Sequence, residues 1–353
     1  MRSAALFLAA LVFGGCERAE PEADPTCGGK APLAARGPFP VGVRTIDVDG
    51  LAIEVWYPAI EGARDVGSFY DLRDWLHAEG QAKVEAGVLK MPVEAARDAP
   101  PADGPFFAVV FSHGLAAYRS QSTFLTTHLA SHGFVVLAPD HLSRGLARLL
   151  AGAMPSFEDA PQELMKAIAF ARGPRDARLP NIDSSRIATA GHSAGAGSSA
   201  AVALDPAARV WVNLAGTSSD PAPAVPALFM TGSHDGVVPS SQTRAAFEAH
   251  TSTASYFELN AAGHLVFSDI CEIAKERGGL VAVARETQVT INPLFLALGG
   301  DGCTTRDLPP SVGWPPILHF VTAAIVRALR PAESVADDDT AASCFGAAIL
   351  SRQ

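Results

Sequence analysis

The chain has 353 residues, of which 48% are hydrophobic and 18% are charged, so it can bury one large core or two smaller ones. The formal net charge of −10 disfavours non-specific binding to nucleic acid or anionic lipid, and no Lys- or Arg-rich run counters it. We therefore expect a globular protein without a nucleic-acid partner.

The N-terminal sequence predicts export. Arg2 precedes the apolar run 4–13, which has the length of a signal peptide and is too short to span a bilayer. The run ends in VFGGC, which resembles a bacterial lipoprotein processing site with Cys16 as the lipidated residue; a simple cleaved signal is the alternative. We expect residues 1–15 to be a signal peptide and 16–40 a tether. The protein would be periplasmic, anchored in the outer membrane through Cys16, or secreted.

Four further cysteines suit an oxidising compartment, and they allow three pairings. We favour Cys271–Cys303, which closes a local insertion, and Cys27–Cys344, which ties down the two ends of the chain. No Cys-x-x-Cys spacing is present, so we expect no metal site at these cysteines.

The first predicted elements are strands 43–48 and 51–56, which Asp49-Gly50 joins into an antiparallel hairpin. Residues 57–105 are long and irregular, with a helix predicted over 72–85, and such a segment is usually functional or a partial cap. Buried strands then alternate with helices. Strands are predicted at 106–111, 134–139, 186–190, 209–215, 227–232 and 254–260, and helices at 121–131, 157–172, 194–204, 242–250 and 314–329.

This alternation predicts an α/β fold, with a mostly parallel central sheet flanked by helices and the antiparallel hairpin at its N-terminal edge. We expect the main domain to span 41–330. Within it, 57–105 and 268–313 are possible caps or insertions, and 331–353 is expected to be a surface tail.

The strand at 186–190 ends in Gly191-His192-Ser193-Ala194-Gly195 and a helix follows, which is the pattern of a nucleophile elbow. In such a turn, side chains beside the serine would collide with neighbouring backbone, and the two glycines remove that collision. Ser193 would then sit at the carboxyl edge of the sheet beside a helix N-terminus, which favours developing negative charge.

A nucleophilic serine needs a base and an orienting acid. Asp235 and His264 each follow a predicted buried strand, so both would reach the carboxyl edge near Ser193. Asp220 is a weaker candidate for the acid because it precedes a strand. Asp140 ends an earlier strand and could hold a loop or shape the pocket.

Other histidines have simpler explanations. We expect His192 to point away from the site as packing, and His234 to be structural or solvated. His128 and His132 are four apart on a helix and could suit a metal, but no third ligand lies nearby in the sequence, so we expect surface or helix-end residues. For the oxyanion we expect the N–H groups of Ala194 and of Leu115, which follows Gly114 in the loop after strand 106–111.

Together these stretches resemble α/β-hydrolases, namely the platelet-activating-factor acetylhydrolase and dienelactone-hydrolase-like esterases and the bacterial cutinase and polyester hydrolase group. The matching stretches are VVFSHGLAAYRSQSTFLTTHLASHGFVVLAPDH, SSRIATAGHSAGAG, GSHDGVVP and YFELNAAGH. The resemblance implies a triad of Ser193, Asp235 and His264. The chain departs from these relatives at Ala194, where they often carry Met or Phe.

The expected function is a serine carboxylester hydrolase that forms an acyl-enzyme on a neutral or lipid-like ester, without cofactor or metal. Alternatives are a polyester or cutin hydrolase, an acyltransferase using the same site, and a non-catalytic binding protein on a hydrolase scaffold. The substrate would be a small-molecule or polymeric ester.

Overall fold

The protein is described here by a computed structural model that covers residues 24–63, 67–289 and 298–353. The predicted signal peptide, 1–15, and the candidate lipidation residue Cys16 lie outside the described residues.

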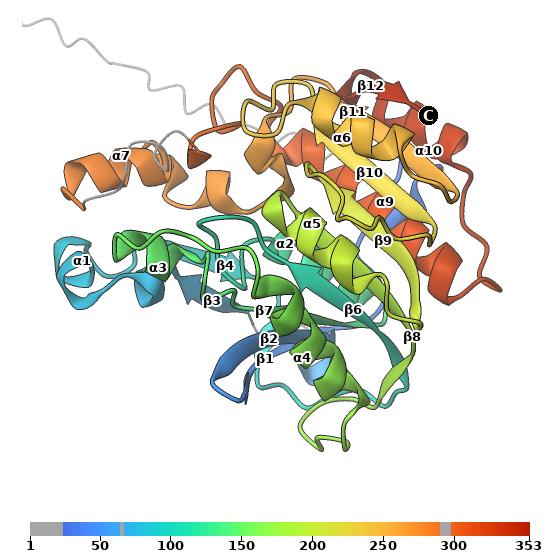
Figure 1. The fold of residues 1–353 in the computed structure, drawn as a ribbon, viewed down its shortest axis with the longest axis horizontal. Helices are drawn as coiled ribbons and strands as arrows, with labels where there is room; N and C mark the ends of the chain where they lie inside the picture. The colour runs from blue at the N-terminus through green and yellow to red at the C-terminus, as the bar shows by residue number, and fades with distance from the viewer. Residues whose placement is uncertain (1–23, 64–66, 290–297) are drawn as a thin grey trace, which may run out of the picture.

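A ten-stranded sheet runs through the molecule (Figure 1). In spatial order its strands are β12 (Ile349–Arg352), β11 (Ala254–Leu259), β10 (Ala227–Gly232), β9 (Ala208–Leu214), β8 (Ile182–His192), β6 (Phe106–Ser112), β7 (Phe134–Pro139), β2 (Leu51–Pro58), β1 (Val41–Val48) and β5 (Ala96–Arg97). The six strands from β11 to β7 pair in parallel, whereas β12 with β11, β2 with β7 and β1 with β2 pair in antiparallel fashion. Strand β5 pairs with β1 in parallel. The predicted fold class is confirmed, although β5 rather than the hairpin forms the outermost strand at that edge.

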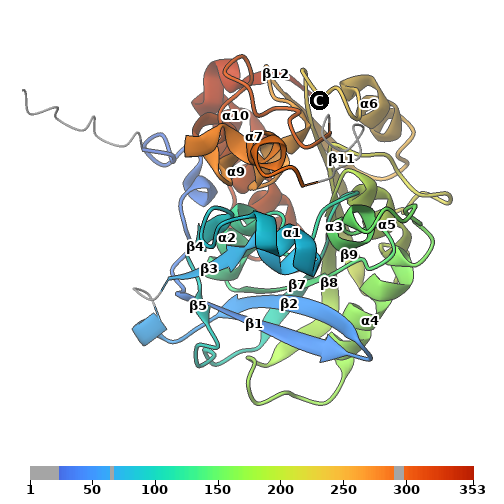
Figure 2. The same ribbon diagram turned by 90° about the vertical axis from the view of Figure 1, so that its left-hand side faces the viewer.

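Helices cover both faces of the sheet (Figure 2). One face carries α2 (Thr123–Ser131) and α9 (Pro310–Leu329), and the other carries α4 (Ala160–Arg172), α5 (Ala194–Val202) and α6 (Ser240–Glu248). Strand β6 shows why its apolar run is continuous: Val109 and Phe111 enter one core while Ala108 and Val110 enter the other. Helix α9 is apolar and long enough to cross a membrane, but most of its residues are buried in the fold.

The segment 57–105 does not contain the single helix predicted over 72–85. A 3-10 helix, Leu72–Trp75, is followed by the short helix α1 (Ala78–Lys83), and β3 (Ser68–Asp71) pairs with β4 (Lys90–Val93) as a separate hairpin. Two capping side chains explain the break, because Asp71 accepts from the N–H of Arg73 and His77 accepts from that of Gly80, so each begins its own turn of helix.

The described part of the predicted tether, residues 24–40, differs from that prediction because it is packed against the domain. Ala31 and Ala34 are buried. The rings of His128 and His132 bond to the carbonyls of Leu33 (2.9 Å) and Ala35 (3.0 Å). Both histidines lie at the C-terminal end of α2, which agrees with the helix-end alternative, whereas a surface position is wrong for His128, which is buried. Both rings hold the N-terminal segment on α2.

The predicted surface tail, 331–353, is also part of the fold. It forms α10 (Asp338–Phe345) and then β12, which pairs with β11 and becomes an edge of the sheet. The disulfide Cys27–Cys344 joins this region to the N-terminal segment, and Cys271–Cys303 closes the second insertion. These are the two pairings favoured from the sequence.

Three short helices lie together at one end of the molecule, beyond the sheet: α1, α3 (Leu146–Leu150) and α7 (Gly279–Glu286) (Figures 1 and 2). Helix α7 belongs to the second insertion and lies over α1, and Lys83 Nζ at the end of α1 donates to the carbonyl of Gln288 at 3.4 Å. The two insertions therefore meet on the same side of the domain.

Candidate active site

Ser193 occupies a sharp turn between β8 and α5. Its backbone has φ 59° and ψ −125°, a strained conformation for a residue with a side chain. A Cβ atom at Gly191 would lie 2.1 Å from the carbonyl oxygen of Gly195, and one at Gly195 would lie 2.0 Å from that of Ser112. Only glycine fits either position, so the local sequence accounts for the turn.

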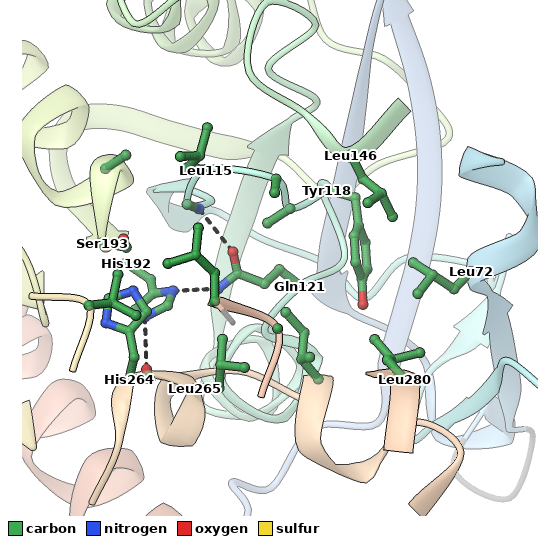
Figure 3. A pocket seen from close by; sticks show the side chains of 18 of the residues that line it. Leu72, Leu115, Tyr118, Gln121, Leu146, His192, Ser193, His264, Leu265 and Leu280 are labelled. Atoms are coloured by element: carbon green, nitrogen blue, oxygen red, sulfur yellow. Dashed lines mark hydrogen bonds between the residues drawn. The ribbon is translucent and has the colours of Figure 1, made fainter. Parts of the chain in front are cut away.

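His264 and Asp235 follow neighbouring strands, β11 and β10, and meet where these strands end. His264 Nδ1 lies 2.8 Å from Asp235 Oδ2, and both side chains are buried. Asp235 Oδ1 accepts the N–H groups of Val237 and Val238, which fixes the carboxylate. Ser193 and His264 line the same cavity (Figure 3), although among the described residues no hydrogen bond joins the Ser193 hydroxyl to the ring.

The other acidic candidates lie elsewhere. Asp220 is exposed. Asp140 accepts hydrogen bonds from Trp75 Nε1 (3.1 Å) and from the backbone and side chain of Arg119, so it holds the loop after β6 and part of the first insertion. His234 is half-exposed and lies 3.3 Å from Asp307.

The loop after β6 is held from two sides at Gly114. Its N–H donates to Gln121 Oε1 at 2.9 Å, and its carbonyl accepts from His113 Nδ1 at 2.8 Å. The His113 tautomer follows from its other partner, since Nε2 must accept the N–H of His141 at 2.9 Å. Burial lowers the pKa of His113 to about 4, which keeps the ring neutral.

This arrangement directs the Leu115 N–H. In a trans peptide the C=O and N–H groups point in opposite directions, so a Gly114 carbonyl held by His113 turns the Leu115 N–H away from that ring. Leu115 and Ala194 both line the cavity beside Ser193, and neither N–H has a partner among the described residues. A Cβ at Gly114 would lie 3.2 Å from Ser193 Cβ, which shows how close the loop comes to the elbow.

Gln121 and His192 connect this loop to the histidine loop. Gln121 Nε2 lies 2.7 Å from His192 Nδ1, and His192 Nε2 lies 3.1 Å from the carbonyl of His264. Because the Gln121 oxygen accepts from Gly114, its NH₂ group must donate to His192, whose Nε2–H then donates to His264. Burial and the neighbouring His264 ring lower the pKa of His192 well below its usual value. His192 is buried as predicted, but it also joins Gln121 to the loop of His264 through its two ring nitrogens.

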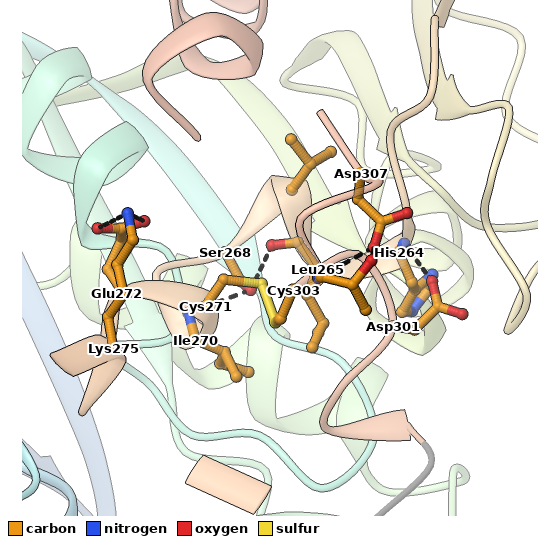
Figure 4. Close-up of a disulfide and its surroundings, with 12 residues drawn as sticks. His264, Leu265, Ser268, Ile270, Cys271, Glu272, Lys275, Asp301, Cys303 and Asp307 are labelled. Carbon is orange, nitrogen blue, oxygen red and sulfur yellow. Dashed lines mark hydrogen bonds and ion pairs between the residues drawn. A yellow bond between two sulfur atoms is a disulfide. The ribbon is translucent and has the colours of Figure 1, made fainter. Parts of the chain in front are cut away.

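Asp301 is a residue of this region that the sequence reasoning missed. Its Oδ1 accepts the N–H of His264 at 2.6 Å (Figure 4). Its Oδ2 accepts the N–H of Gly236 at 3.1 Å. One carboxylate therefore joins the loop of His264 to the loop of Asp235. The only sequence signal is its place between two glycines just before Cys303, because the contact spans 37 residues.

A second Ser–His–acid chain lies behind the elbow. Ser112 Oγ is 2.8 Å from His141 Nε2, and His141 Nδ1 is 2.7 Å from Glu163 Oε2. Ser112 is fully buried, it accepts from Arg144 Nη2 at 2.9 Å, and it does not line the cavity. Since no substrate carbonyl can reach it, this chain is structural.

The cavity next to Ser193 has a volume of about 540 Å³. Its walls come from both insertions, from α3 and from the elbow and histidine loops. No Asp, Glu, Lys or Arg belongs to the described residues that line it, and its polar groups include Gln121, His192 and His264 at the Ser193 end (Figure 3).

Comparisons with known proteins indicate the family of the chain. The model of the PET hydrolase-like family matches residues 98–277, half of the chain, and the match includes Ser193, Asp235 and His264. The chain is similar to bis(hydroxyethyl) terephthalate hydrolase of Streptomyces coelicolor, with 28% identity over 169 residues, which are 46% of this chain and 51% of that protein. It thus spans about half the length of this curated relative.

Among solved structures, a ferulic acid esterase from Streptomyces cinnamoneus is similar with a TM-score of 0.61 and 21% identity, over 86% of this chain and 94% of that chain. At this identity the likeness concerns the fold, which is the α/β-hydrolase fold expected from the sequence. The chain belongs to the PET hydrolase-like family.

Proposed function

We propose that the protein is a carboxylic ester hydrolase that uses Ser193, His264 and Asp235. The observation that carries the proposal is the 2.8 Å bond between His264 Nδ1 and Asp235 Oδ2, beside a strained serine in the same cavity. The carboxylate holds the Nδ1–H tautomer and leaves Nε2 to accept the serine proton. Family membership and the names of both similar proteins also support ester hydrolysis.

In the proposed mechanism, Ser193 Oγ attacks the ester carbonyl carbon while its proton passes to His264 Nε2. The N–H groups of Leu115 and Ala194 stabilise the tetrahedral oxyanion, and each such donor is typically worth about 2.7–4 kcal/mol of barrier. His264 then protonates the departing alcohol and an acyl-enzyme remains. Water, deprotonated by His264, attacks the acyl carbon and releases the acid and free Ser193.

The absence of a bond between Ser193 and His264 is compatible with this mechanism, because catalytic hydrogen bonds are often long before substrate binds. The substrate is proposed to be neutral at the part held by the cavity, since the described lining residues carry no charged side chain to pair with an ion.

Replacing Ser193 with Ala tests the proposal. We expect hydrolysis of p-nitrophenyl butyrate to fall by roughly a millionfold, as in a comparable triad, and labelling by a fluorophosphonate probe to vanish. Ser112→Ala is the matched control, because Ser112 belongs to the buried chain and that variant should still be labelled. Turnover that survives Ser193→Ala, or a wild-type chain that the probe does not label at Ser193, would refute the proposal and favour a binding protein on this scaffold.

A second candidate is hydrolysis of polyesters or their oligomers, which the family match favours. Bis(hydroxyethyl) terephthalate and a polyester film separate this function from a general esterase. Turnover of the soluble diester and the film at rates comparable to p-nitrophenyl butyrate would support it.

Export is also part of the proposal. Two disulfides suit an oxidising compartment, and the N-terminal sequence resembles a processed signal. The mass of the mature N-terminus would distinguish a lipidated Cys16 from simple cleavage.

A further inference from the structure

The cavity extends well beyond the groups that would handle an ester. Ser193 and His264 lie at one end, and Leu72, Leu146 and Leu280 lie at the other (Figure 3). A volume of about 540 Å³ is that of a pocket for a sizeable ligand, whereas an acetyl group would occupy only the catalytic end.

The far part of the cavity is built mainly from aliphatic side chains of the two insertions. The first insertion supplies Leu72, Leu76 and Val84, and α7 of the second supplies Leu280, Val283 and Ala284. Thr287 is polar, but its hydroxyl donates to the carbonyl of Val283 at 2.7 Å. The Tyr118 hydroxyl also lies in this part of the cavity (Figure 3), and it is buried without a hydrogen-bond partner among the described residues. Apart from this group, the region offers mainly apolar surface.

The wall formed by the second insertion is anchored at both ends. At its start, Asp269 accepts hydrogen bonds from Thr123 Oγ1 (2.7 Å) and from the N–H of Phe124 (3.1 Å), at the beginning of α2. Near its end, Asp301 holds the histidine loop and Cys303 is bonded to Cys271. The apolar wall thus has a fixed place relative to Ser193.

We propose that this part of the cavity binds a flexible, unbranched aliphatic chain attached to the scissile ester, an inference that rests on the proposed function. The polar ester group lies at Ser193, and each further methylene covers apolar wall that water would otherwise contact. Hydrophobic transfer favours each buried methylene by up to about fourfold in binding. The aliphatic chain can belong to the acyl part or to the alcohol part of the ester, and the experiment distinguishes the two.

The experiment compares wild type, Leu280→Trp and a matched control, Arg285→Trp. Both residues lie on α7, but Leu280 lines the far end of the cavity whereas Arg285 is exposed. Each protein is assayed with p-nitrophenyl acetate, butyrate and octanoate, and with ethyl, butyl and octyl acetate. Melting temperatures and the hydrolysis of p-nitrophenyl acetate show whether the variants fold.

For wild type and Arg285→Trp we expect kcat/KM to rise along one series by up to about fourfold per methylene. In Leu280→Trp the rise should stop at the four-carbon chain, so the ratio of kcat/KM for the eight-carbon ester to that for the two-carbon ester should fall well below the wild-type ratio. A rise along the p-nitrophenyl series places the chain on the acyl side, and a rise along the alkyl acetates places it on the alcohol side.

The proposed binding of an aliphatic chain would be refuted by either of two results. One is a kcat/KM that does not change with chain length in both series for wild type, and the other is a Leu280→Trp profile that follows wild type. The proposed function would still stand in either case, provided that p-nitrophenyl acetate is hydrolysed and that Ser193→Ala abolishes this hydrolysis. Leu280→Ala gives a further measure, because a larger far end should not truncate the profile.

Discussion

Asp301 shows how one side chain can set the geometry of two others. Its carboxylate accepts the N–H of His264 and the N–H of Gly236, so it fixes the spacing between the loop of the proposed base and that of the proposed acid. It does not itself contact the cavity. We therefore assign it a positioning role.

We expect Asp301→Ala to lower kcat by about 10- to 100-fold, because small displacements of catalytic groups have large effects on rate. KM should change little, since the residue does not touch the substrate cavity. Steady-state kinetics with p-nitrophenyl butyrate measure both constants. Glu272→Ala is the matched control, because Glu272 belongs to the same insertion and pairs with Lys275 at the surface rather than with the catalytic loops. Equal kcat values for the two variants would remove the positioning role.

The sequence predicts those site residues that directly follow a buried strand. It does not predict residues whose contacts join an insertion or a loop to a distant segment. Ser193, Asp235 and His264 each follow a buried strand, so the fold alone predicted that they would gather, and the structure brings Asp235 and His264 into contact. Asp301 and Gln121 do not directly follow a predicted buried strand. Their contacts depend on how distant segments pack, which local pattern does not encode.

At the scale of elements, a buried charged cluster attaches the first insertion to the sheet. Glu54 on β2 is fully buried and accepts from Tyr70 (3.0 Å), Arg97 (2.5 Å) and Arg119 (3.0 Å). Tyr70 comes from the insertion and Arg119 from the loop after β6. The cluster therefore ties one wall of the cavity and the Leu115 loop to the same strand.

We expect Glu54→Ala to lower the free energy of unfolding by about 3 kcal/mol, because removing one partner of a buried ion pair leaves the others uncompensated. Urea denaturation followed by circular dichroism measures this change. Glu94→Ala is the control: its pair with Arg36 is at the surface, with the Glu94 side chain 75% exposed, and should contribute less than about 1 kcal/mol. A similar loss in both variants would contradict the special role of the buried cluster.

The central strands were predictable and the peripheral elements were not. Strands 134–139 and 227–232 have the predicted bounds, because strands buried on both faces are continuous apolar runs. Strand β12 is half-exposed and four residues long, and its pairing with β11 joins residues that lie far apart in the sequence. A short amphipathic tail gives no local sign of such a partner.

At the scale of the whole molecule, several buried histidines make stability depend on pH. Burial lowers the pKa of His113 to about 4 and that of His128 to about 3, and it also lowers the pKa values of His141 and His192. In the unfolded chain these rings titrate near pH 6.5. These four rings therefore bind fewer protons in the folded state than in the unfolded state between about pH 6.5 and pH 3–4. Burial raises the pKa of Asp269 to about 7, which acts in the opposite direction. Four rings outweigh one carboxyl group, so stability falls as the pH decreases through that window.

We expect the urea midpoint to be nearly constant above pH 7 and to fall steeply below pH 6, since each such ring can contribute about 1.4 kcal/mol per pH unit. His128→Gln should flatten the decline, because a neutral amide can still donate to the carbonyl of Leu33. His234→Gln, at an exposed position, should leave it unchanged. An identical pH dependence in wild type and His128→Gln would show that His128 does not contribute.

The disulfide between the two ends of the chain has a consequence for biosynthesis. Cys27 is synthesised 317 positions before its partner Cys344, whereas Cys271 precedes its partner Cys303 by only 32 positions. During that interval the thiol of Cys27 lacks its native partner, and the next cysteine that emerges is Cys271. Native pairing therefore requires that Cys27 stays reduced until Cys344 has emerged, or that a wrong bridge is later exchanged.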